Sequence, residues 1–168
     1  LEKNVTTDAI FLIDPNNPTG FTLFDFGTEG WKEVIRFAKD KKKLLILDFC
    51  FAAFMLPDKN LEVFDLYELL ESSGVTYIAM EDTGKTWPLQ DAKAAMIKAS
   101  VDIYDDIYNI HTAYLLNVSP FILNVLTQYV LDSEKDNFAS VFGLLERNRT
   151  LGTEILADSL LIPVDPIV

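Results

Sequence analysis

The sequence predicts an α/β protein with a mainly parallel sheet flanked by helices and a helical C-terminal portion. Three short apolar runs, at residues 9–13, 44–47 and 75–80, have the length and nearly continuous hydrophobicity of strands buried on both faces. The segments between these runs carry apolar residues at helical spacing, and helical character dominates after residue 100. Strand and helix therefore alternate along the first half of the chain.

Each expected element has its own signal. Between the first two runs, the apolar residues at helical spacing are Trp31, Val34, Ile35 and Ala38. A second helix is expected around residues 63–70, with Asn60 as its N-cap. A fourth strand is expected at 94–99, followed by helices at 102–116, 121–132 and about 135–160.

Composition limits the class of protein. The chain has 168 residues, 49% of them apolar, which suits one domain with a real core. Its net charge of −12 disfavours nucleic acid and anionic membranes as partners. Cys50 is the single cysteine, so neither an internal disulfide nor a multi-cysteine zinc site can form within the chain. No metal is predicted. The reducing cytoplasm is the expected location. No stretch approaches about 18 uncharged apolar residues, so no membrane span is expected.

Polar motifs follow the three apolar runs, where ligands sit in an open α/β sheet. The first is Asp14-Pro15-Asn16-Asn17-Pro18-Thr19-Gly20, the second begins at Asp48, and the third is Glu81-Asp82-Thr83-Gly84-Lys85-Thr86-Trp87. A carboxylate at the end of a buried strand, such as Asp48, is costly to desolvate without a partner. Burial of a lysine such as Lys85 favours the neutral amine, which is the form that reacts with a carbonyl group. In a purely structural interpretation, the first motif is a dense turn and Asp48 caps the next one.

These motifs, in this order and at this spacing, resemble the central part of the large domain of fold-type I aminotransferases of class I and II, which use pyridoxal 5'-phosphate (PLP). The resemblance covers roughly residues 8–161. It implies that Asn17 presents its amide to the phenolic oxygen of the cofactor, next to an Asn17–Pro18 bond that is cis in relatives. It also implies that Asp48 pairs with the pyridine nitrogen, and that Lys85 forms the Schiff base and moves the proton at the substrate's α-carbon.

Two positions near these residues depart from the family pattern. Phe51 stands where the family has a tyrosine that donates to the phenolic oxygen, so that oxygen is expected to be held more weakly. Asp14 stands where the family more often has asparagine.

The expected phosphate site departs further. Asp82 and Gly84 occupy the positions of two serines, and Lys93 occupies that of the arginine that binds the phosphate. Lysine supplies the charge without the bidentate guanidinium, and Asp82 repels a phosphate unless it is turned away or neutralised. The Thr83 and Thr86 hydroxyls, or amides near Gly84, are candidates for the role of the serines.

By resemblance, the full-length protein transfers an amino group between an amino acid and a 2-oxo acid, as a homodimer. We expect residues 1–161 to form part of the PLP-binding large domain and residues 162–168 to begin a linker toward a missing small domain. The isolated chain is then expected to be inactive and to bind PLP poorly.

Other functions remain open at this point. Lyases, decarboxylases and synthases that use PLP share the same three residues, and a non-catalytic interaction or regulatory module on this scaffold is a further alternative. Gly84-Lys85-Thr86 also resembles the end of a nucleotide-binding loop, but that loop needs glycine where the chain has Ala79.

Overall fold

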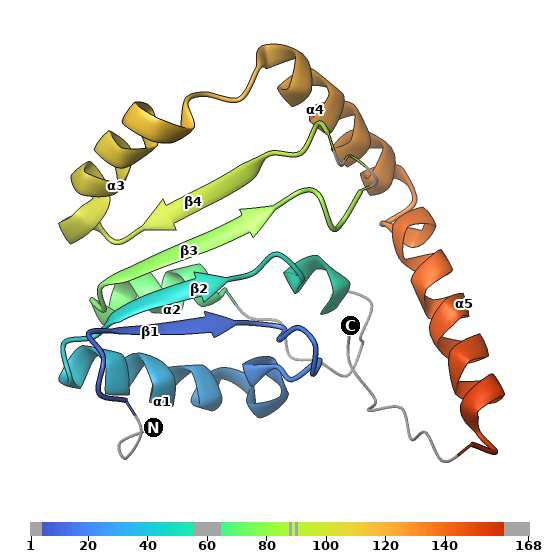
Figure 1. Cartoon of the computed structure of the whole chain (residues 1–168), viewed down its shortest axis with the longest axis horizontal. Coiled ribbons are helices and arrows are strands. Elements are labelled where there is room, and N and C mark those ends of the chain that lie inside the picture. The colour runs from blue at the N-terminus through green and yellow to red at the C-terminus, as the bar shows by residue number, and fades with distance from the viewer. Residues whose placement is uncertain (1–4, 56–64, 88, 90, 160–168) are drawn as a thin grey trace.

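The sheet has four strands in the order β1-β2-β3-β4 (Figure 1). The computed structural model describes residues 5–55, 65–87, 89 and 91–159. The strands are β1 (Ala9–Ile13), β2 (Leu44–Asp48), β3 (Tyr77–Asp82) and β4 (Ala95–Ala99). The first three are parallel and β4 is antiparallel to β3. The predicted α/β fold with a mainly parallel sheet is confirmed.

Two helices cover one face of the sheet. In α1 (Gly27–Asp40), the four predicted apolar residues are the buried ones, and they face the buried side chains of β1, β2 and β3. Helix α2 (Leu66–Ser73) is capped by Asp65, whose carboxylate accepts the Glu68 N–H at 3.0 Å. The predicted cap, Asn60, lies outside the described residues. The core thus sits between these helices and the three parallel strands.

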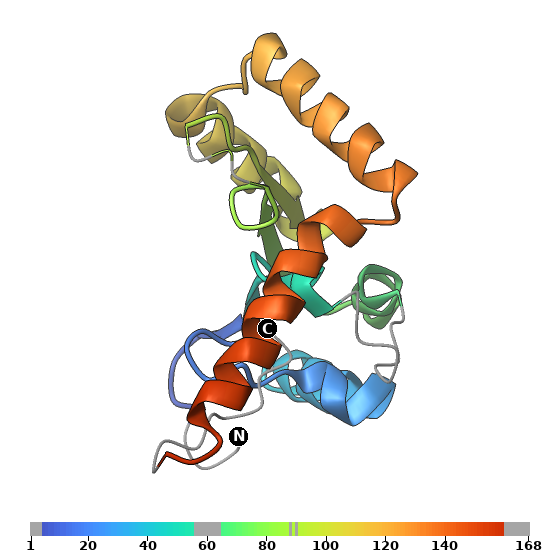
Figure 2. The ribbon, with the colours of Figure 1, turned by 90° about the vertical axis from the view of Figure 1, so that its right-hand side faces the viewer.

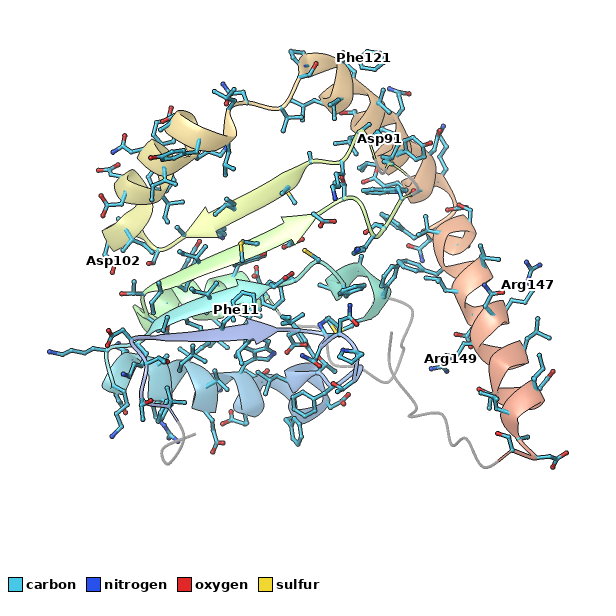
Figure 3. All side chains as sticks on the ribbon, viewed as in Figure 1. Phe11, Asp91, Asp102, Phe121, Arg147 and Arg149 are labelled. Atoms are coloured by element: carbon cyan, nitrogen blue, oxygen red, sulfur yellow. The ribbon has the colours of Figure 1, made fainter. Side chains whose placement is uncertain are left out.

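The prediction that the strands are buried on both faces is wrong for the described residues. Burial alternates along the strands, with Leu45 and Leu47 buried and Ile46 between them only half-buried. Phe11 of β1 is 55% exposed and lies on the open face, where Figure 3 labels it. The reason is that α1 and α2 pack against one face only (Figure 1).

The helical portion follows β4. It comprises a 3-10 turn (Val101–Ile103), α3 (Tyr104–Ile110), a π-helical turn (His111–Leu115), α4 (Pro120–Lys135) and α5 (Ala139–Leu156). Ser119 caps α4, with Pro120 at its first position. Helix α5 lies on the side to which the three parallel strands point, and Figure 2 shows it crossing in front of the sheet when seen from there.

No single described helix is long and apolar enough to cross a membrane, and Val101–Leu115 with Pro120–Lys135 reaches that length only as a pair bent by 112°. Within the described part of the chain, no group of three or more His, Cys, Asp or Glu side chains is placed to hold a metal ion.

Candidate active site

The three predicted motifs leave the sheet at the same edge. Ile13, the last residue of β1, is in register with Asp48, and Asp48 is in register with Met80 of β3. Backbone hydrogen bonds continue past the strands, since the Asp14 N–H donates to the Asp48 carbonyl at 3.0 Å and the Phe49 N–H donates to the Met80 carbonyl at 2.8 Å. The strand-end segments that carry Asn17, Asp48 and Lys85 therefore start side by side.

Asn17 lies at the exposed tip of a loop closed by its own backbone. The Asn16 N–H donates to the Phe21 carbonyl at 2.8 Å, and the Gly20 N–H donates to the Asn16 carbonyl at 2.7 Å. Gly20 has φ of 70°, a conformation that favours glycine. The Asn17–Pro18 bond is cis, as the resemblance implies.

Asp14 is buried at the base of this loop, with 3% of its surface exposed. Its carboxylate accepts the Thr22 hydroxyl proton and the Leu23 N–H, the latter at 2.9 Å. Burial raises the pKa of Asp14 above its ordinary value, although both hydrogen bonds act in the opposite direction. Sequence reasoning noted Asp14 only as a departure from the family. Its anchoring role depends on Thr22, which folding brings to it.

Asp48 is half-buried at the end of β2, and its Oδ1 atom accepts the Cys50 N–H at 3.0 Å. Burial first, and then hydrogen bonds to the Asp48 and Asp82 carboxylates, raise the pKa of the Cys50 thiol to about 12. The thiol is therefore protonated at neutral pH. This agrees with the interpretation of Cys50 as a packing residue rather than a nucleophile.

Lys85 lies in a turn that the Trp87 N–H closes by donating to the Thr83 carbonyl at 3.2 Å. The Lys85 side chain is exposed in the described structure. Lys85 lies three residues beyond the end of β3, outside the core that α1 and α2 cover. The Lys85 Nζ atom lies 5.6 Å from the centroid of the Phe51 ring, within the range of a cation–π contact.

Lys93 lies close to the Lys85 turn because β4, which follows Lys93, pairs antiparallel with β3. Its stem lies over Gly84, where a Cβ atom would come within 2.8 Å of Lys93 Cδ. Gly84 therefore makes room for the lysine that replaces the family's arginine. The role of Lys93 as a phosphate ligand stays a prediction.

Asp82 and Thr83 are engaged within the same turn. Asp82 Oδ1 accepts the Gly84 N–H at 2.8 Å, so this oxygen is held by the turn itself. The Thr83 hydroxyl donates to the Ala94 carbonyl at 3.2 Å and accepts the Ala94 N–H at 3.0 Å. A hydroxyl has one proton to donate. The role of Thr83 as a phosphate ligand thus stays a prediction that requires the hydroxyl to give up its bond to the Ala94 carbonyl and to donate that proton to the phosphate.

The fold and the strand-end motifs are those expected of the fold-type I class. The family model described as "Aminotransferase class I and II" matches residues 1–157, and the chain belongs to that family. A search of curated proteins found no match.

Several solved structures share the fold. The structure of MppP soaked with the product 2-ketoarginine is 29% identical, with a TM-score of 0.79, and the match covers 91% of this chain and 41% of that one. A Pyrococcus protein, A1, is 20% identical with a TM-score of 0.77, and the match covers 98% of this chain and 42% of that one. A PLP-dependent aminotransferase from Streptococcus suis is 19% identical with a TM-score of 0.72, and the match covers 96% of this chain and 40% of that one. The chain thus spans less than half the length of these structures.

Proposed function

We propose that the full-length protein is a PLP-dependent aminotransferase that moves an amino group between an amino acid and a 2-oxo acid. The proposal depends mainly on the shared location of the three motifs. Asn17, Asp48 and Lys85 follow neighbouring parallel strands at one edge of the sheet. Membership of the aminotransferase class I and II family supports the same activity.

The residues present fit the cofactor chemically. A half-buried carboxylate at Asp48 suits a cationic ring nitrogen, and an exposed ammonium at Lys93 suits a phosphate. The Asn17 amide, exposed at its loop tip, suits a phenolic oxygen. Phe51 contributes ring packing against Lys85 and no hydrogen bond donor from its side chain.

Each residue then has a chemical role. Bound PLP supplies the electron sink for breaking a bond at the substrate's α-carbon. Lys85 is proposed to anchor the cofactor covalently, and its Nζ atom to move the proton between the substrate's α-carbon and the C4′ carbon of the cofactor. Asp48 is proposed to keep the proton on the ring nitrogen, and Lys93 to bind the phosphate. The side chain of Lys85 is exposed and therefore accessible to a substrate.

The substrate class and assembly belong to the same proposal. MppP, described with 2-ketoarginine as its product, provides one similar protein whose product is a 2-oxo acid, and this supports that substrate class here. We further propose a homodimer located in the cytoplasm, with neither nucleic acid nor membrane as partner, in which residues 1–161 form part of the large domain. The predicted linker, residues 162–168, lies outside the described residues.

The proposal is tested by an amino-transfer assay on the full-length protein with added PLP, a panel of amino acids that includes arginine, and a 2-oxo acid acceptor. Lys85→Ala is expected to lower turnover by roughly 10²–10⁴-fold, the usual contribution of a general base. Lys32→Ala is the matched control, because Lys32 is an exposed lysine paired with Glu29 on α1. Equal turnover in wild type and Lys85→Ala would exclude the proposed mechanism.

A further inference from the structure

The Lys85 turn is attached to helix α4. Trp87, two residues after Lys85, donates its indole Nε1–H to the Ser133 hydroxyl oxygen at 3.0 Å, across 46 positions of sequence. Ser133 lies in the last turn of α4 and is 4% exposed. Figure 1 shows the loop after β3 reaching the junction between α4 and α5.

Aromatic rings connect both sides of Lys85 to that same junction. Trp87 contacts Phe138 at 6.4 Å between ring centroids, and Phe138 stacks on Phe142 of α5 at 6.0 Å. On the other side of Lys85, Phe51 contacts Phe54 at 5.9 Å, and Phe54 contacts Phe142 at 6.4 Å. We call these five residues the aromatic circuit. It starts beside the Lys85 ammonium and returns to the Lys85 turn.

The junction holds an unfavourable backbone conformation. Asn137 and Phe138 have φ of 53° and 62°, in the left-handed region that is costly for residues with a Cβ atom. Such conformations persist where surrounding contacts enforce them, and they are frequent near functional sites. Here the Phe138 N–H donates to the Ser133 carbonyl at 2.7 Å. Ser133 therefore binds Phe138 through its backbone and Trp87 through its side chain.

We infer that Trp87 and Ser133 are positioning residues for Lys85, and that the α4–α5 junction holds the lysine-bearing turn in place. The inference rests on the proposed function, because it concerns the lysine to which that function assigns the covalent step. Physically, the exposed Lys85 stem has many rotamers, and fixing the turn beneath it lowers the entropy lost when Lys85 captures a carbonyl compound. The aromatic circuit adds a second support through Phe51.

The test compares wild type, Ser133→Ala, Trp87→Phe and their double variant in the full-length protein. The measured quantity is the PLP concentration that gives half-maximal borohydride-trapped adduct on Lys85. Losing one buried hydrogen bond is expected to raise this concentration roughly three- to tenfold in each single variant, with no further rise in the double variant. Ser133→Thr keeps the hydroxyl and is expected to restore the wild-type value.

Two controls separate positioning from stability alone. Ser72→Ala removes an exposed helix-end hydroxyl that bonds Leu69 on α2, and it is expected to leave the PLP concentration unchanged. Amide hydrogen exchange at residues 85–87, measured without PLP, is expected to be faster in Ser133→Ala and Trp87→Phe.

Two outcomes overturn the inference in distinguishable ways. If wild type forms the Lys85 adduct and both single variants form it at the same PLP concentration with only a lower melting temperature, positioning fails while the proposed function stands. If wild type forms no adduct on Lys85, the proposed function fails and the inference falls with it.

Discussion

At the scale of single residues, Asp14 sets how the Asn17 loop responds to pH. Its burial raises its pKa in the folded state above the value of 3.8 expected for the unfolded chain. The folded state therefore binds this proton more tightly than the unfolded state does. It follows that Asp14 contributes most to stability below pH 3.8, and that this contribution is lost as the pH rises through the folded-state pKa.

The corresponding prediction concerns Asp14→Asn, which keeps the shape of the side chain and removes the titration. As pH rises above 3.8, the unfolding free energy of wild type should fall relative to that of Asp14→Asn, by about 1.4 kcal/mol per unit of pKa difference. Chemical denaturation across pH measures this difference. A difference in unfolding free energy that does not change with pH would contradict this role of Asp14.

The candidate residues are predictable from the sequence because the strand-end rule needs only local patterns. Asn17, Asp48 and Lys85 each follow an apolar run, so their common sheet edge was predictable. The hydrogen-bond partners that fix the surrounding loops are not predictable in this way. The Thr22–Asp14 bond spans eight positions and the Trp87–Ser133 bond spans 46, and nothing in the local pattern identifies either partner.

At the scale of elements, helix α2 depends on its two ends. Asp65 caps its first turn, and Gly74 ends it with φ of 68°. The helix is eight residues long, so its ends are a large fraction of it. An isolated helix of this length is marginal in water, so capping and the burial of Leu70 stabilise it.

We therefore expect Asp65→Ala to lower the unfolding free energy by about 1 kcal/mol, because the Glu68 N–H loses its acceptor. Asp65→Asn keeps an acceptor oxygen and should cost less. Thermal and denaturant unfolding provide the measurement. An equal loss in both variants would show that charge, and not capping, is responsible.

Element boundaries show what the sequence pattern leaves open. A helix was expected from about residue 135, whereas α4 extends to Lys135 and α5 begins at Ala139. The break comes from left-handed conformations at Asn137 and Phe138, and a phenylalanine gives no sequence signal for such a conformation. The strands were expected from their apolar runs, but which faces they bury depends on packing that sequence runs do not specify.

At the scale of the whole molecule, the described chain is an α/β layer with one covered and one open face. Helices α1 and α2 cover the first, while Phe11 and Met96 are exposed on the strands, at 55% and 62%. The chain spans about 40% of the length of the similar solved structures. This is the basis for placing the activity in the full-length protein and for testing it there.

The proposed function requires that Lys85 is the lysine that binds the cofactor. The most direct measurement is peptide mapping by mass spectrometry after the full-length protein is treated with PLP and reduced with borohydride. We expect one dominant reduced adduct, on Lys85, which disappears in Lys85→Ala. A dominant adduct on another lysine, such as Lys93, or no adduct in wild type, would contradict it.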